Sequence, residues 1–209
     1  MIKNITIKET YPKIFTILIK DNYERAMFFC RVQEYYESQN NFFKNKKFSF
    51  WDYHKWYSKK NNNIFSYTAD WSGFNFPLET ALKCQKINKE ETPYDFLMNK
   101  VLAKIKKRNS YIIGVKSLSC STYKHELCHG FYYTNAKYKE EMQKITKSLD
   151  KKSYKNLKLN LLKLGYHQSV IDDEIQAYLS TGADIRITKG IKNIEKTCKN
   201  YKKIFCSFL

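Results

Sequence analysis

Two histidines with a glutamate between them are the residues of this chain best suited to chemistry. His125 and His129 stand at positions i and i+4 of the segment "HELCH", and Glu126 directly follows the first histidine. On an α-helix these positions lie one turn apart on one face, so both imidazole rings can reach a single metal ion. Glu126 is rotated by about 100° from His125 and can take a proton from a metal-bound water. The pattern predicts a metal-binding catalytic helix.

The opposite side of this segment is apolar. Leu127 and Phe131, with Tyr123 one turn earlier, form a stripe that can anchor the helix in a core. Cys128 lies near the histidine face, where a thiolate ligand is conceivable, but a small buried thiol is the favoured interpretation. A motif this short also occurs by chance. The alternative is a helix whose histidines are solvated or hydrogen-bonded in the core.

The segment from Tyr111 to Gly182, roughly a third of the chain, resembles the zincin metallopeptidases. In that fold a strand beside the active-site helix supplies an edge for extended substrate, a role that the resemblance assigns to "YIIGVK", residues 111–116. Metzincins continue their motif with a glycine and a third histidine. Here the matching positions are Tyr132 and Asn135, which disfavours that branch.

A catalytic zinc needs three protein ligands and a water. The gluzincin branch takes its third ligand from a glutamate on a later helix, and Glu174 follows His129 by 45 residues. The segment "EIQA" from Glu174 to Ala177 resembles the ExxA signature of gluzincins, in which the small residue permits close approach to the HExxH helix. Ile171 and Ile175 give the segment helical apolar spacing. Glu174 is therefore the expected third ligand.

The neighbouring acidic residues are the alternatives to Glu174. Either Asp172 or Asp173 could bind zinc, as aspartates do in another zincin branch. Acidic residues in the first turn of a helix also complement its dipole without any metal. A further role for Asp173 is to orient one of the histidines by a hydrogen bond.

Gluzincins commonly place a tyrosine or histidine near the developing oxyanion, so the resemblance implies such a group here. The candidates are Tyr178, His167, Tyr132 and Tyr133. Tyr178 lies one turn beyond Glu174 on the same face and is the residue that we select. The chain contains 17 tyrosines, so packing is the competing explanation for each of them, and His167 in "LGYHQS" suits a loop or a helix cap.

The function expected from these residues is that of a zinc-dependent peptidase acting on a peptide or protein substrate. The metal would activate a water and polarise the scissile carbonyl, with Glu126 as general base. The chain also resembles HExxH proteins of AT-rich viral and bacterial genomes. The alternative is a catalytically inactive zincin-fold protein whose basic surface contacts nucleic acid or an acidic partner. The oligomeric state cannot be read from the sequence.

The charge of the chain bears on that alternative. The formal net charge is +18, yet only four of the 38 basic residues are arginine, the side chain that reads phosphate and bases best. Lysine also accompanies abundant Asn, Ile, Tyr and Phe, the residues favoured by A- and T-rich codons. The composition therefore predicts at most weak nucleic-acid or polyanion contact.

Three features indicate a cytoplasmic protein from a reducing compartment. The segment at residues 1–24 has charges within its apolar stretch, unlike a secretory signal. No run of 18 apolar residues occurs, which predicts that no segment spans a membrane. The six cysteines form no CxxC pair and are too sparse for a disulfide scaffold.

The elements expected around the motif give one α+β domain over residues 1–209, zincin-like and helix-rich in its C-terminal half, with a small mixed sheet beside the HExxH helix. Its parts would be 1–110, a metal-binding core at 111–182 and a tail at 183–209, whose structure the sequence leaves open. Before the motif, strands are expected at Lys13–Lys20 and, buried or at an edge, at Tyr111–Lys116, with loop and short strand at 61–77.

Three helices are expected between them. The first covers Asn22–Ser38 and is capped by Asn22, and the second covers Ser49–Lys60 with a capping box of Ser49 and Asp52. The third is capped by Thr92 and has Pro93 at its first position.

Overall fold

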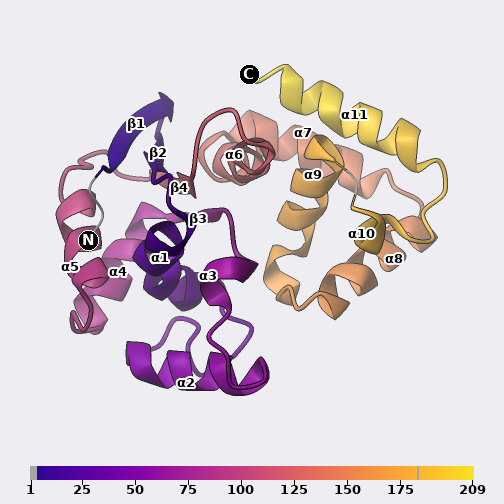
Figure 1. Cartoon of the computed structure of the whole chain (residues 1–209). Helices are drawn as coiled ribbons and strands as arrows, with labels where there is room; N and C mark the ends of the chain where they lie inside the picture. Colours follow the sequence, from indigo (N-terminus) through magenta and orange to yellow (C-terminus); the bar gives the residue numbers. More distant parts are fainter. Residues whose placement is uncertain (1–3, 183) are drawn as a thin grey trace. The chain divides into compact units, whose positions relative to one another are not determined.

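The computed structural model describes residues 4–182 and 184–209, which form two compact units, Met1–Tyr123 and Lys124–Leu209 (Figure 1). Each unit is described by itself below. The expected starts of the domain at Met1 and of the tail at Ala183 lie outside the described residues. The single zincin-like domain with its three parts stays a prediction.

The first unit contains a four-stranded mixed sheet in the order β1-β2-β4-β3. Strands β1 and β2 are antiparallel, β2 and β4 are parallel, and β3 is antiparallel to β4. The strands are β1 (Thr6–Tyr11), β2 (Ile14–Leu18), β3 (Phe74–Pro77) and β4 (Tyr111–Val115). Together with the helices, this sheet confirms the α+β class, and the expected strands at 13–20, 61–77 and 111–116 are present.

Strand β4 is interior to the sheet and buried along its whole length. It pairs with β2 on one side and with β3 on the other. The backbone groups of both its edges are therefore used within the sheet. The expectation that this strand offers an edge to extended substrate is wrong, because β3, which arrives from residues 74–77, occupies that edge.

Along the described part of the first unit, five helices alternate with the strands and lie wholly within the unit. They are α1 (Asn22–Glu37), α2 (Phe50–Lys60), α3 (Tyr67–Asp70), α4 (Leu78–Ile87) and α5 (Pro93–Leu102). Helix α1 lies against β3, β4 and the helices α3, α4 and α5. It is therefore the element around which the core of this unit is built.

The helix starts follow local capping chemistry. In α5 the hydroxyl of Thr92 and the carboxylate of Asp95 form the full reciprocal capping box, with Pro93 in the first turn. Ser49 caps α2 as expected, by accepting from the backbone N–H three residues later. The expected cap of α1 is wrong by one residue: Asp21, not Asn22, caps the helix by accepting from the backbone N–H of Glu24 at 2.8 Å.

Aromatic rings fill the contact between α1 and the sheet. Phe29 of α1 is fully buried and stacks on Phe74 of β3, with ring centroids 5.1 Å apart and an angle of 8° between the planes. On β4 the ring meets Gly114, where any side chain would overlap it. The glycine therefore allows the helix to approach the strand closely.

A buried carboxyl group lies in the same unit. Glu34 of α1 is buried, and hydrogen bonding by the hydroxyl groups of Ser38 and Tyr53 favours its charged form. Burial raises the pKa of Glu34 to about 7, although these hydrogen bonds act in the opposite direction. The carboxyl is thus poised to titrate near neutrality.

The second unit is helical in its described residues. Its elements are the part of α6 (Ser121–Thr134) from Lys124 onward, α7 (Ala136–Lys147), α8 (Lys151–Lys163), the short 3₁₀ helix η1 (Gln168–Val170), α9 (Ile171–Thr181), α10 (Ile185–Thr188) and α11 (Ile194–Cys206). This confirms the helix-rich C-terminal half.

The segment that the sequence left open forms α11, which packs against α9 and α7. Tyr201 and Phe205 are its buried residues. They lie four residues apart and so on one face of the helix.

No helix in the described part of the chain is long and apolar enough to cross a membrane. All six cysteines are free.

Candidate metal centre

Helices α6 and α9 bring His125, His129 and Glu174 together within the second unit. One ligand atom from each of the three lies within 4.8 Å of the others. The Nε2 atoms of the two histidines are 3.3 Å apart. The Glu174 carboxylate oxygens lie 3.8 Å from Nε2 of His125 and 3.7 Å from Nε2 of His129. Among residues 4–182 and 184–209, this is the only group of three or more His, Cys, Asp or Glu side chains that could hold a metal ion.

The three side chains differ in their exposure. His129 and Glu174 keep 3% and 5% of their side-chain surface exposed, whereas His125 keeps 20%. The cluster is therefore buried on the side of His129 and partly accessible beside His125. A catalytic metal needs such an open position.

Asp173 contacts the other nitrogen of one histidine. Its Oδ1 atom lies 2.9 Å from Nδ1 of His129. When the His129 ring is neutral, a hydrogen bond there places its proton on Nδ1 and leaves Nε2 as the nitrogen that could bind a cation. The geometry thus gives Asp173 the orienting position, whereas Asp172 accepts from the hydroxyl of Tyr154 at 2.9 Å.

Thr181 stands in the corresponding position beside His125. The threonine hydroxyl donates to the carbonyl of Ala177 at 2.7 Å. Its oxygen remains free to accept from Nδ1 of His125, at 3.5 Å. This longer contact favours the same arrangement as in His129, with Nε2 directed at the cluster.

The two imidazoles have opposite pKa shifts. Burial and the neighbouring His129 lower the pKa of His125 to about 3. Burial also acts to lower the pKa of His129, but the carboxylates of Asp173 and Glu174 outweigh it and hold that pKa well above the usual value. The His125 imidazole is thus neutral at physiological pH, while His129 lies in a strongly negative environment that favours a cation or a proton.

Glu126 is buried beside this cluster, with 6% of its surface exposed. Its negative charge acts on His129 and on the tyrosines Tyr166 and Tyr178, raising the pKa of each. The expected general base and the expected metal ligands therefore belong to one electrostatic site, although Glu126 is not a member of the ligand group.

Tyr178 reaches the cluster through its ring. The ring centroid lies 4.6 Å from that of His125, with an angle of 63° between the planes. The hydroxyl of Tyr178 is 2.7 Å from that of Tyr166. Burial raises the pKa of Tyr178, so its hydroxyl keeps its proton at neutral pH. Sequence reasoning missed Tyr166, because it precedes η1 and meets Tyr178 only through the fold.

The other candidates from the sequence have different surroundings. The ring of Tyr132 lies under the ammonium group of Lys139 at 5.2 Å, and Tyr133 is 43% exposed. His167 caps η1 by accepting from a backbone N–H, which is the capping role considered for it. Cys128 is fully buried, and burial raises the pKa of its thiol far above the usual value. This agrees with a small packing residue.

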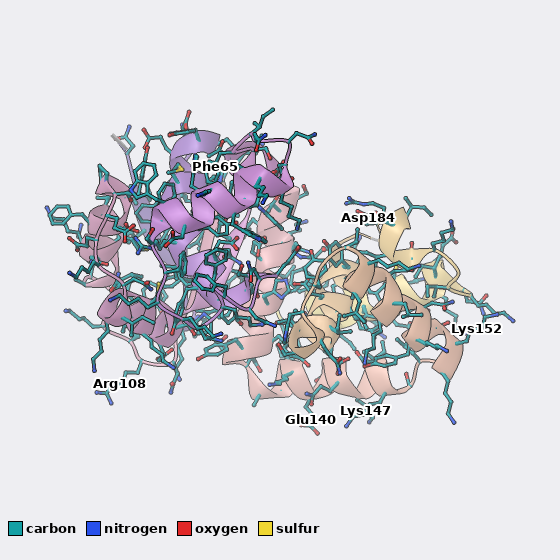
Figure 2. All side chains as sticks on the ribbon, turned by 90° about the horizontal axis from the view of Figure 1, so that it is seen from below. Phe65, Arg108, Glu140, Lys147, Lys152 and Asp184 are labelled. Atoms are coloured by element: carbon teal, nitrogen blue, oxygen red, sulfur yellow. The ribbon has the colours of Figure 1, made fainter. Side chains whose placement is uncertain are left out.

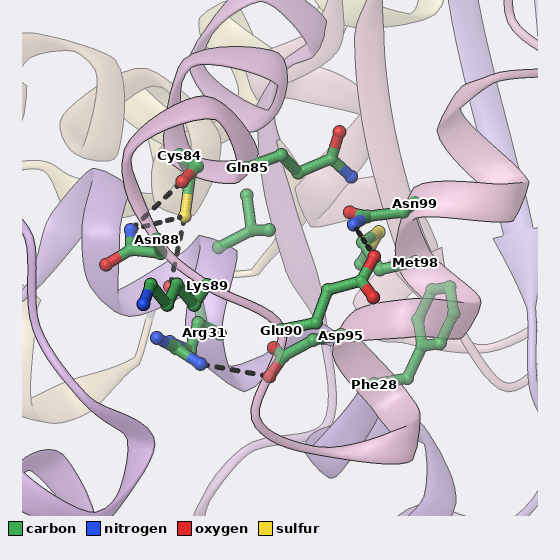
Figure 3. Close-up of a pocket in the computed structure, with 11 residues that line it drawn as sticks. Phe28, Arg31, Cys84, Gln85, Asn88, Lys89, Glu90, Asp95, Met98 and Asn99 are labelled. Atoms are coloured by element: carbon green, nitrogen blue, oxygen red, sulfur yellow. Dashed lines mark hydrogen bonds and ion pairs between the residues drawn. The ribbon is translucent and has the colours of Figure 1, made fainter.

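A separate pocket lies in the first unit, lined by residues of α1, α4 and α5 (Figure 3). The guanidinium of Arg31 bonds to the carboxylate of Asp95 at 2.9 Å and to the carbonyl of Phe48 at 2.7 Å. The amide of Asn99 bonds to the carboxylate of Glu90. The ion pair of Arg31 and Asp95 thus joins α1 to α5, and the bond between Asn99 and Glu90 joins α5 to the loop before it, so these polar groups are used in packing contacts.

Comparisons with known proteins were made at three levels. No protein-family model, no curated protein and no solved structure matches this chain. The similarity to zincins therefore remains an expectation from the sequence motif.

Proposed function

We propose that this protein is a zinc-dependent peptidase of gluzincin type, with His125, His129 and Glu174 as the metal ligands. The observation that carries the proposal is the convergence of two Nε2 atoms and one carboxylate in a single buried cluster. Asp173 and Thr181 contact the Nδ1 atoms, which supports Nε2 as the ligand atom of both histidines.

The donor set suits zinc in chemistry and in spacing. Zinc binds imidazole nitrogen and carboxylate oxygen, and at a bond length of about 2.0–2.1 Å two tetrahedral ligands lie roughly 3.4 Å apart. The Nε2 atoms are separated by 3.3 Å and the carboxylate oxygens lie 3.7 and 3.8 Å from them. Three protein ligands leave a fourth position for water. The lone pairs of the Nε2 atoms and of the carboxylate oxygens would repel one another at these distances unless a cation or a proton lay between them.

Bound zinc would supply a Lewis acid that lowers the pKa of water and polarises a carbonyl. Glu126 then accepts a proton from the attacking water and delivers it to the leaving amine. The support for this role is its burial at the cluster and its charge there. Tyr178, which keeps its phenolic proton beside His125, is suited to donate a hydrogen bond to the developing oxyanion.

The test replaces Glu126 with glutamine, which keeps size and hydrogen bonding but removes the basic carboxylate. The matched control is Glu140→Gln on α7, whose exposed side chain projects away from the helices (Figure 2). Both variants should keep about one zinc per chain by metal analysis. Hydrolysis of a peptide that the wild type cleaves should fall by at least about 10² in Glu126→Gln and stay unchanged in Glu140→Gln.

Two results would contradict the proposal. One is wild-type protein that takes up no zinc when zinc is added. The other is equal cleavage by Glu126→Gln and wild type.

The second candidate is an inactive protein that binds a polyanion. The observation that favours it is α8, which carries five lysines and no acidic residue, with Lys151, Lys152, Lys155 and Lys163 exposed. Such binding would fall steeply with salt and would be unchanged in Glu126→Gln. Zinc-bound protein that cleaves nothing in a peptide library but shows this salt dependence would favour the second candidate over the peptidase.

A further inference from the structure

We propose that Gln176 and Tyr138 are positioning residues for the metal centre. They hold the Asp173 carboxylate against His129 and so keep Nε2 of His129 as the metal-binding atom. This inference rests on the proposed zinc site. It assigns a role to two residues that lie outside the ligand group and do not reach the reacting atoms.

A continuous set of hydrogen bonds carries the proposal. The hydroxyl of Tyr138 on α7 donates to Oε1 of Gln176 on α9 at 2.7 Å. Nε2 of Gln176 donates to Oδ1 of Asp173 at 2.9 Å. The same oxygen lies 2.9 Å from Nδ1 of His129 on α6. The chain of contacts thus joins α7, α9 and α6 and ends on a proposed ligand.

The direction of each bond is fixed by chemistry. An ionised carboxylate only accepts, so the amide must turn its NH₂ group to Asp173 and its oxygen to Tyr138. The tyrosine hydroxyl supplies the matching donor. The flipped amide would set its oxygen against the carboxylate oxygen of Asp173 and lose that bond. Tyr138 therefore selects the orientation in which Gln176 supports Asp173.

Burial makes this arrangement rigid. Gln176 and Tyr138 are both fully buried, and a buried amide or hydroxyl without a partner costs free energy. Asp173 keeps 23% of its side chain exposed, so its carboxylate would otherwise be free to turn to solvent. The buried amide of Gln176 donates a hydrogen bond to the Asp173 carboxylate and so holds it towards the interior of the unit.

The competing explanation is that the contacts only join α7 to α9. A purely structural role would change the stability of the protein without changing the affinity of its metal site. It would also act independently of Asp173. Zinc affinity and its dependence on Asp173 are therefore the readouts that separate the two explanations.

The experiment measures zinc affinity by competition with a chromogenic chelator in the full chain. The variants are Gln176→Met, which keeps volume but not the amide, and Tyr138→Phe. The control is Tyr201→Phe on α11. It removes an equally buried hydroxyl of the same unit, bonded to the Thr146 hydroxyl at 2.9 Å, with no contact to Asp173 among the described interactions.

We expect the zinc Kd to rise about tenfold in Gln176→Met, at the lower end of the effect of removing partners outside the ligand group. Tyr138→Phe should act in the same direction with a smaller change, and Tyr201→Phe should leave the Kd unchanged. In an Asp173→Ala background, Gln176→Met and Tyr138→Phe should have no further effect, because the group through which they act is absent.

The outcomes separate this inference from the proposed function. Effects that persist in the Asp173→Ala background, or Tyr201→Phe weakening zinc as much as Tyr138→Phe, would overturn the positioning role and leave the peptidase intact. Coupling to Asp173 in a protein that binds zinc but cleaves no peptide would support the positioning role and favour the second candidate function over the peptidase. Wild-type protein that binds no zinc would overturn both. Thermal unfolding of the metal-free variants confirms that each remains folded.

Discussion

The imidazole of His125 has a threonine oxygen behind it, whereas that of His129 has a carboxylate. The two rings stand one helical turn apart, yet their pKa values are shifted in opposite directions, because burial and His129 lower that of His125, whereas the charges of Asp173 and Glu174 outweigh burial at His129. His125, the more exposed ring, forms the open side of the cluster.

The roles of the two neighbouring acidic residues on α9 can be separated by substitution. We predict that Glu174→Ala weakens zinc far more than Asp173→Ala does. In the proposed site the first would remove a coordination bond, and the second would remove an orienting hydrogen bond that is worth about 10- to 100-fold in affinity. Competitive chelator titration of both variants measures the difference.

The reverse order of affinities would make Asp173 the third ligand. Small and equal effects would show that α9 does not contribute to the metal site. Asp172→Ala is the matched control, because this carboxylate on the same turn bonds to Tyr154 outside the ligand group.

At the level of elements, the sequence predicted those helices and strands whose signals lie in residues adjacent along the chain. The cap at Thr92 followed by Pro93 and the β-branched run of β2 are local signals, and both elements begin near where expected, although α5 ends at Leu102, before the basic segment at 104–108. The cap of α1 was misplaced because Asp21 and Asn22 are adjacent residues with similar capping ability. The sequence left open whether β4 is a buried or an edge strand, because its position depends on pairing with β3 from a distant segment.

In the candidate site, too, local spacing could be predicted from the sequence and contacts between distant elements could not. His125 and His129 stand four residues apart on one helix, so their spacing alone predicts a shared face, with Glu126 beside it. Glu174 required the resemblance of its own segment to a known signature. The contacts of Tyr166 with Tyr178, and of Tyr138 with Gln176, join different elements and have no periodic signal in the sequence.

The packing of α1 on the sheet can be tested at its tightest point. We predict that Gly114→Ala lowers the free energy of unfolding by about 1–3 kcal/mol, the usual cost of overpacking a core. The added methyl group would overlap the ring of Phe29, which is held between other buried rings. Denaturant unfolding of the variant measures the loss.

A second substitution checks the cause. Phe29→Leu in the Gly114→Ala background should cost less than Phe29→Leu in the wild type, because the smaller side chain relieves the overlap. Additive losses would show that the two positions do not interact.

At the scale of the whole molecule, the buried carboxyl of Glu34 makes stability depend on pH. Its pKa is raised to about 7 in the folded protein, so the folded state holds the proton more tightly than the unfolded chain does. This contribution to stability is fully present below the ordinary pKa of a glutamate and is lost as the pH rises towards 7. Replacing the carboxyl with a neutral amide removes that loss.

We therefore predict that Glu34→Gln stabilises the protein more at pH 8 than at pH 5, by about 2 kcal/mol. Denaturant unfolding of wild type and variant at both pH values measures the difference. Glu90→Gln, which removes an exposed carboxylate of the same unit, is the control. An equal effect of Glu34→Gln at both pH values would show that the carboxyl is already ionised or already neutral throughout this range.

The packing of α11 against α9 has a consequence for the order of events during synthesis. The ribosome makes the two histidines first, then Glu174, and only later Tyr201 and Phe205, which bury against the rest of the unit. A nascent chain that has just exposed its histidines lacks both Glu174 and the helix that packs on α9. If the proposed zinc site is right, its donor set would be complete once Glu174 has been made, but α9 would gain the packing that holds it in place only after translation of α11.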